Sequence, residues 1–149
     1  MPEDVPESLA ARVVAESGDA ILVADREGKV RLWNRGAEAM FGWTAEEMIG
    51  KSMDPIIPER LRGRHWEGWD KVMASGTTRY GKDVLAVPAA RKDGTTVSIE
   101  FTISLFRDAA GVVTGAAAIM RDVTARFKRD KERNLRLKEL EAKAGARER

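Results

Sequence analysis

Cysteine is absent from this 149-residue sequence, and histidine occurs only once, at His65. The lack of cysteine excludes disulfides, thiolate zinc sites and a catalytic thiol. One histidine is too few for a His-rich metal site and argues against a Ser-His catalytic triad. The sequence also lacks a phosphate-binding loop and a nucleophile elbow. We therefore expect a protein that is not an enzyme.

Long apolar runs are missing as well, since none approaches the roughly 20 residues that span a bilayer. The N-terminus, Met1-Pro2-Glu3-Asp4, is acidic and has no basic region typical of a signal peptide. These absences predict a cytoplasmic protein without a membrane partner.

Charge is distributed unevenly along the chain. Residues 125–149 carry ten Lys or Arg against five Asp or Glu, whereas the first 124 residues carry 16 against 19. Because acids are interleaved with the bases of the tail, this pattern favours a solvated helical face, and we expect no nucleic-acid partner.

What the sequence does contain is a series of β-like runs separated by turns. Acid-plus-glycine turns lie at 25–28, 92–94 and 108–111, and Asp and Gly suit tight hairpins. The expected strands are 20–25, 30–34, 84–90, 95–106 and 112–121. In the fourth, apolar and polar residues alternate, which is typical of a strand with one buried face. Its apolar positions are Val97, Ile99, Phe101, Ile103 and Leu105.

The middle of the chain predicts helices. Thr44 followed by Glu47 forms a capping box at the start of one helix. Pro58 is suited to the first turn of a longer helix, which Gly76 ends.

Each end of the chain predicts a further helix. Residues 7–17 are amphipathic, and a charged helix begins at Thr124. With Val123 at heptad position d, Asn134 falls at an a position, where a buried Asn can fix the register of a dimer. We expect a homodimer built from both end helices, with a single solvated tail helix as the alternative. The residues expected to be buried in the dimer are Leu9, Val13 and Phe127.

The order of these elements and several segments resemble a PAS domain over about positions 7–125. The matching segments are 19–25 and 30–38 in the first two strands, 41–51 in the helices that follow, 91–94 in the central hairpin and 120–124 in the exit motif. The fold class expected is α+β, with a five-stranded antiparallel sheet in the order 2-1-5-4-3 and helices on one face. The domain limits expected are a cap helix at 1–17, a PAS domain at 18–123 and a charged helix, able to form a coiled coil, at 124–149.

This resemblance implies a sensor and dimerisation module of bacterial-type signal transduction. A ligand held between the long helix and the sheet would shift the sheet. The shift would pass through Asp122, Val123 and Thr124 into the tail helix and on to a downstream signalling protein.

His65 lies on the apolar side of the predicted long helix, together with Leu61 and Trp69. One imidazole cannot build a zinc site, but it can be the proximal ligand of a haem iron, because the porphyrin itself already supplies most of the ligands of the iron. Residues 58–65 resemble the segment that carries this histidine in the haem-PAS domains of rhizobial oxygen-sensor kinases. The resemblance implies haem b as the candidate cofactor. The alternative is a core histidine in a cofactor-free domain that acts only in dimerisation.

The same resemblance implies the rest of a gas-binding haem site. Lys71 stands where an Arg near a haem propionate is expected. Tyr80 lies just before the third expected strand, and its position alone favours a surface aromatic in a loop, with a hydrogen bond to a bound gas as the alternative role. Leu85 replaces the oxygen-stabilising Arg, and Asp83 replaces a methionine ligand, so we expect weak selection for oxygen over carbon monoxide. The expected apolar walls are Leu61, Trp69, Leu85, Phe101 and Ile103. A second alternative is a small organic acid bound by Arg64, Lys71 or Arg79.

Overall fold

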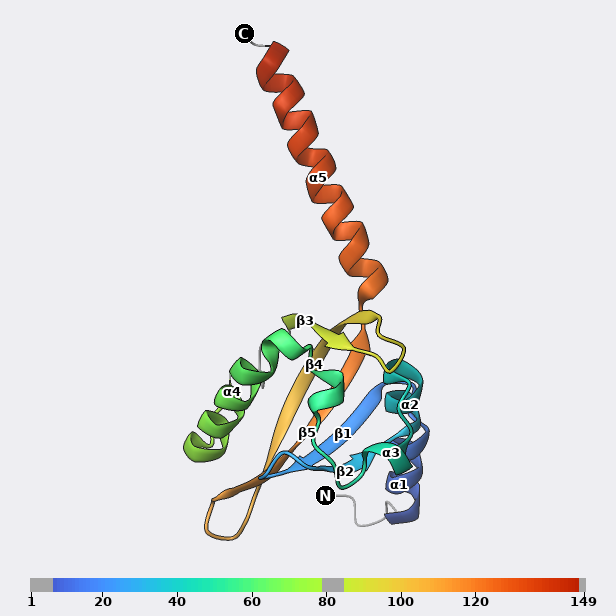
Figure 1. Cartoon of the computed structure of the whole chain (residues 1–149), viewed down its shortest axis with the longest axis vertical. Coiled ribbons are helices and arrows are strands. Elements are labelled where there is room, and N and C mark those ends of the chain that lie inside the picture. The colour runs from blue at the N-terminus through green and yellow to red at the C-terminus, as the bar shows by residue number, and fades with distance from the viewer. Residues whose placement is uncertain (1–6, 79–84, 148–149) are drawn as a thin grey trace.

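The computed structural model describes residues 7–78 and 85–147 (Figure 1). Its helices are α1 (Glu7–Glu16), α2 (Arg35–Phe41), α3 (Ala45–Met48), the 3-10 helices η1 (Asp54–Ile56) and η2 (Glu59–Leu61), α4 (Arg62–Ser75) and α5 (Thr124–Arg147). Its strands are β1 (Ala20–Asp25), β2 (Val30–Trp33), β3 (Leu85–Ala90), β4 (Thr96–Arg107) and β5 (Val113–Asp122).

The strands form one antiparallel sheet in the order β2-β1-β5-β4-β3. This confirms the predicted topology and the predicted α+β class. The first strand has the predicted limits, and the limits of β2, β4 and β5 differ from the predicted ones by one residue. β3 ends at the predicted residue, and its predicted first residue, 84, lies outside the described residues. Hairpins are local in sequence, so turn signals fix their limits closely.

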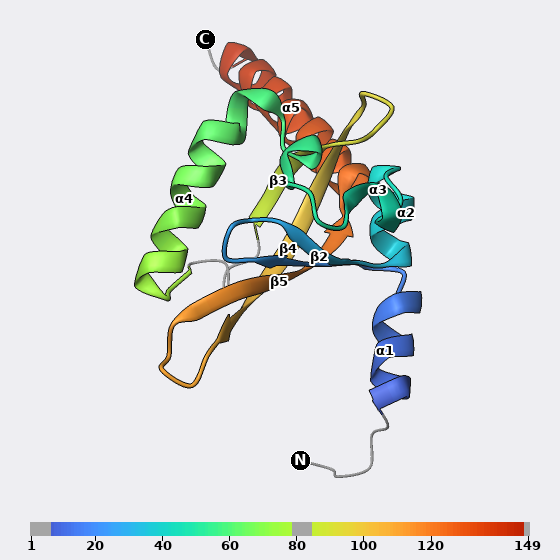
Figure 2. The same ribbon diagram turned by 60° about the horizontal axis from the view of Figure 1, so that its bottom comes forward.

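β4 presents alternate residues to the helical face of the sheet, as predicted. Val97 and Ile99 are buried, while Phe101, Ile103 and Leu105 are half-buried. Burial decreases along the strand because its far end extends beyond the covering helices, as Figure 2 shows for the β4–β5 hairpin.

Asn34 connects β2 to α2 and ties α1 to the sheet. Its Oδ1 accepts hydrogen bonds from the amides of Ile21 at 2.8 Å and Ala37 at 2.9 Å. Its Nδ2 donates to the carbonyls of Val14 at 2.8 Å and Asp19 at 3.0 Å. The side chain is buried, so these four bonds satisfy groups that have no access to water.

The long helix begins later than Pro58. Leu61 donates its amide to the Pro58 carbonyl at 2.8 Å, which gives the 3-10 turn η2, and α4 starts at Arg62. The Arg62 Nε donates to two carbonyls of the preceding loop, which holds this turn against η1. Gly76 ends α4 with a φ of 72°, as predicted.

α5 projects away from the sheet at the end opposite the β4–β5 hairpin (Figure 1). α1 lies beside α2 and contacts it (Figure 2). None of the helices in the described part of the chain is long and apolar enough to cross a membrane.

Candidate functional site

His65 lies within a group of aromatic side chains on α4. Its ring makes an edge contact with Trp66 at a centroid distance of 4.7 Å and lies nearly parallel to Trp69 at 6.4 Å. The two indoles meet each other edge-on at 6.0 Å and pack against the core. The ring atom Nδ1 is fully buried and has no hydrogen-bond partner among the described residues.

Two tryptophan N–H groups attach this aromatic group to loops outside α4. Trp66 Nε1 donates to Asp54 Oδ1 at 2.6 Å, and Trp69 Nε1 donates to the Arg26 carbonyl at 3.0 Å. The Trp66 ring also lies against Gly28, where an added Cβ would come within 2.3 Å of it. The β1–β2 turn is therefore shaped to receive Trp66.

The charge state of His65 follows from this environment. Burial lowers the pKa of the imidazole below its ordinary value of 6.5, and the nearby Asp54 carboxylate opposes the shift. Burial dominates because an imidazolium loses more hydration on leaving water than a neutral ring does. His65 is consequently neutral at pH 7, which is the form that binds metals.

The predicted walls of the site come from opposite sides of the domain. Leu61 and Trp69 lie on the helical side and Phe101 on the sheet, and all three pack against the core. Ile103 follows Phe101 on the same face of β4 and is half-buried. The backbone of Leu85 pairs with Phe101. The Leu85 side chain lies outside the described residues.

The predicted polar members of the site are exposed to solvent or lie outside the described structure. Lys71 is exposed and pairs with Glu67 at 3.6 Å, one turn earlier on α4. Arg64 is exposed too. Tyr80, Arg79 and Asp83 lie outside the described residues.

Sequence reasoning missed Asp54 and Gly28, which position Trp66. The sequence predicts a turn at Gly28, and the φ of 81° at this residue confirms the turn. Nothing in the sequence links residue 28 to residue 66, since their contact depends on the packing of α4 over the β1–β2 turn.

The exit from the sheet into α5 is tightly hydrogen-bonded. The Thr124 amide donates to Asp122 Oδ1 at 2.9 Å, and Asp122 Oδ2 pairs with Arg91 at 3.1 Å. Ser98 on β4 donates its amide to the Thr124 hydroxyl and accepts one from the Val123 amide at 2.8 Å. The start of α5 is therefore bonded to both β4 and the end of β5.

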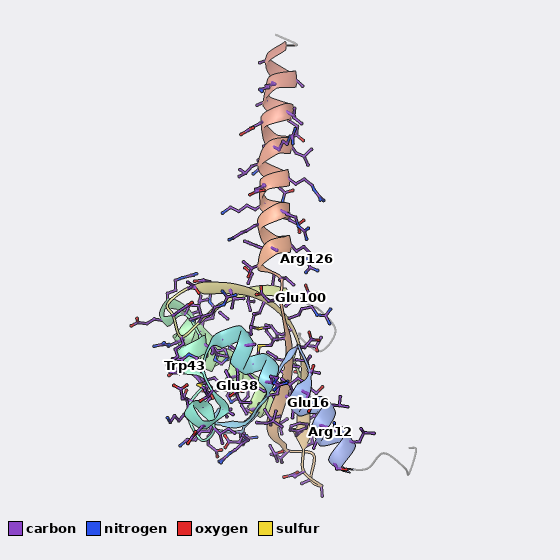
Figure 3. All side chains as sticks on the ribbon, turned by 90° about the vertical axis from the view of Figure 1, so that its right-hand side faces the viewer. Arg12, Glu16, Glu38, Trp43, Glu100 and Arg126 are labelled. Carbon is purple, nitrogen blue, oxygen red and sulfur yellow. The ribbon has the colours of Figure 1, made fainter. Side chains whose placement is uncertain are left out.

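A separate apolar groove of about 590 Å³ lies between α1 and the body. It is lined by Ala10, Ala11, Val14, Ala15, Leu32, Trp33, Asn34, Arg35 and Glu38. The groove is distant from His65 in the fold, since it lies on the α1–α2 side of the sheet (Figures 1 and 3).

Comparisons with known proteins agree with this architecture. An uncharacterised protein of Azorhizobium caulinodans is 34% identical over 124 residues, which are 83% of this chain and 17% of that protein. Sensor protein FixL of Bradyrhizobium diazoefficiens is 32% identical over 89 residues, 57% of this chain and 17% of FixL. Oxygen sensor protein DosP of Escherichia coli is 29% identical over 85 residues, 57% of this chain and 10% of DosP. The chain thus spans less than a fifth of the length of these curated relatives.

A solved structure and a family description show the fold. The PAS domain of a protein from Colwellia psychrerythraea superposes with a TM-score of 0.68 at 24% identity, covering 79% of this chain and 97% of that one. Residues 14–128 match the family described as PAS fold. The chain therefore belongs to the PAS family, and its relatives include sensor proteins.

Proposed function

We propose that this PAS domain is a haem-based gas sensor of a signal-transduction protein, with His65 as the iron ligand. The observation that carries the proposal is the neutral, half-buried His65 imidazole, whose Nδ1 has no partner among the described residues. The relationship to an oxygen sensor protein and to a sensor protein supports it.

The residues around His65 fit a haem. With Nδ1 turned into the protein, Nε2 is the nitrogen left to bind an iron. The half-buried side chains of Leu61, Trp69 and Phe101 would offer apolar surface to the porphyrin, and Ile103 extends that surface along β4. Bound haem would supply an iron that takes up oxygen or carbon monoxide.

A response to a ligand would leave the domain through the sheet. Phe101 is three residues from Ser98 on β4. The Ser98 backbone bonds the amide of Val123 and the side chain of Thr124 at the start of α5. A change that moves Phe101 along β4 would alter these bonds and reorient α5. The output would be delivered to a downstream signalling protein, without catalysis by this domain itself.

The haem proposal is tested by adding haemin to the full chain and recording absorption spectra. We expect one haem per chain and a sharp Soret band that shifts on reduction and on addition of carbon monoxide. His65→Ala should abolish this band. Arg64→Ala is the matched control, because Arg64 precedes His65 on α4 but is exposed, and this variant should keep the wild-type spectrum.

Equal and non-stoichiometric uptake of haemin by the wild type and His65→Ala would reject the haem site. His65 would then be a core residue, and the domain would act in protein–protein association alone.

We also propose that the domain forms a homodimer through α1 and α5. Leu9, Val13 and Phe127 are 49%, 64% and 49% exposed, although all three are large apolar side chains. A second copy of the chain would remove them from water. Arg12 and Glu16 lie one turn apart on α1 and carry opposite charges, so two copies of α1 packed in opposite directions would place Arg12 of each near Glu16 of the other (Figure 3).

Sedimentation velocity tests the dimer. The double variant Leu9→Glu and Val13→Glu should dissociate it, because two buried and unpaired carboxylates in each copy oppose association. Val112→Glu is the control, since Val112 is 49% exposed but lies in the β4–β5 turn. Dissociation by the control variant, or a dimer unaffected by the α1 changes, would place the interface elsewhere.

A further inference from the structure

α5 carries a line of basic residues along one side. Lys or Arg recurs at steps of three, four, three and seven residues, and such steps return to the same side of an α-helix. The members of this basic stripe are Arg126, Arg129, Arg133, Arg136 and Lys143. At 100° per residue they occupy a sector about 100° wide.

The acids of α5 all fall outside the basic stripe. Asp130 and Glu141 lie beyond one border of the sector, and Glu132 and Glu139 lie beyond the other. Around the helix the acids form two narrow strips, one along each border of the stripe, and Lys128, Lys131 and Lys138 lie on the opposite side. The stripe itself therefore contains no acid, although acids and bases alternate along the sequence.

The stripe is exposed and largely unpaired. Every residue of α5 from 125 to 146 is exposed, and its side chains project from the helix along its length (Figure 3). Arg126 pairs with Glu100 at the base of α5. The other four basic residues of the stripe form no ion pair with any described residue.

The geometry of the stripe indicates an extended anionic partner. From Arg126 to Lys143 the helix rises about 26 Å, far more than a single small anion covers. Four of its five members are Arg, whose planar fork binds phosphate oxygens in pairs. Regularly spaced phosphates meet both requirements.

An anionic membrane fits this helix poorly. Membrane-surface helices need a continuous apolar face beside their basic residues. The large apolar residues of α5 point in different directions, with Leu135 on the side away from the stripe and Leu140 inside it.

We propose that the basic stripe of α5 binds the phosphate backbone of a double-stranded nucleic acid without reading its sequence. The four basic side chains without an ion-pair partner among the described residues give the contact its strength, because each releases a counterion from a phosphate that it neutralises. This binding is independent of haem and of the proposed sensing site.

Fluorescence anisotropy of the full chain with a labelled DNA duplex of roughly 20 base pairs tests the proposal. A contact with four phosphates predicts a slope of about −3.6 for log affinity against log salt concentration. The triple variant Arg129→Gln, Arg133→Gln and Arg136→Gln should lower the affinity at least ~tenfold and reduce the slope to about −1. Gln has nearly the helix propensity of Arg, and circular dichroism verifies that α5 persists.

The matched control removes the same charge from the other side of the same helix. Lys128→Gln, Lys131→Gln and Lys138→Gln together should lower the affinity less than ~threefold, because these residues lie outside the stripe. If both triple variants lost the same affinity for the duplex, net charge alone would explain the binding, and the proposal would be overturned. Absence of duplex binding at about 50 mM salt, or binding to phosphatidylserine vesicles in place of the duplex, would overturn it too.

Discussion

The two helical flanks of the sheet are held in different ways. The seven residues of α2 bury Gly36, Ala37 and Phe41, whereas the fourteen residues of α4 bury only Met73. α2 is also capped by Asn34, while α4 has no side-chain cap at its N-terminus. The α4 flank depends instead on half-buried indoles and their bonds to loops.

The difference indicates which flank can respond to a ligand. A segment with few buried apolar contacts moves at a lower free-energy cost than one anchored in the core. His65 stands on the lightly held flank, and the rigid flank provides the frame against which α4 can shift. Four predictions test this comparison.

The largest effect is expected at the core of the rigid flank. Phe41 is fully buried, and its ring packs against Trp33 in a tilted geometry with a centroid distance of 5.5 Å. Phe41→Ala should lower the free energy of unfolding by about 3–5 kcal/mol, measured by urea denaturation. Leu61→Ala, in the turn before α4, should cost less than half as much because Leu61 is only partly buried. Equal costs would remove the contrast between the flanks.

Asn34→Ala should produce the next largest loss, about 2–3 kcal/mol in the same assay. The substitution leaves the buried amide of Ala37 and the carbonyl of Val14 without their partners. Lys128→Ala on exposed α5 is the control and should stay within about 0.5 kcal/mol of the wild type. A loss of free energy of unfolding no larger than that of the control would mean that water replaces the hydrogen bonds of the Asn34 side chain.

A pair of glycines sharpens the comparison on the α4 flank. Gly28 and Gly94 have φ values of 81° and 86°, so Ala at either position costs about 1 kcal/mol in backbone strain. Only at Gly28 does the added Cβ meet Trp66, whereas Gly94 faces open space. Gly28→Ala should therefore cost about 2 kcal/mol and shift the tryptophan fluorescence. Identical fluorescence of the two variants would show that Trp66 does not rest on this turn.

The smallest effect is a pH dependence due to His65. Its pKa is lowered in the folded state by burial, so below the ordinary value of 6.5 the unfolded chain binds more protons. Stability should be complete above pH 6.5 and decline as the pH falls toward the lowered folded pKa. His65→Phe should lose this part of the decline, measured as urea midpoints across that range. An unchanged pH profile in His65→Phe would assign the dependence to other groups.

Local signals in the sequence predicted much of the fold. The alternation from Val97 to Leu105, the capping box at Thr44 and the glycine at position 76 act within a few residues of themselves. The N-cap of α2 at Asn34 is an equally local signal, because Asn precedes a helix-forming segment. The sequence nevertheless predicts a strand over 30–34 that includes this residue. Competition between a strand end and a helix cap explains that one-residue difference.

The candidate site was predictable only in part. The helical period brings His65, Leu61 and Trp69 to one side of the chain, and the structure places all three on the inward side. The attachment of Trp66 to Asp54 and Gly28 could not be read in the same way. Those contacts join segments that are far apart in the sequence, and they form only when the helical connection between β2 and β3 packs over the sheet.

By itself the sequence determined the positions of the strands to within about one residue and the charge pattern of α5, because both arise from periodicity and local turn signals. The sheet order followed only together with the resemblance to a PAS domain, since β1 pairs with β5 from the far end of the domain. Only the tertiary structure decided that α2 is deeply packed and α4 lightly held. It also decided that, among the residues the structure describes, Nδ1 of His65 is buried without a partner and Arg126 alone in the stripe is paired. These properties depend on side chains from distant segments meeting, and the sequence has no local signal for such meetings.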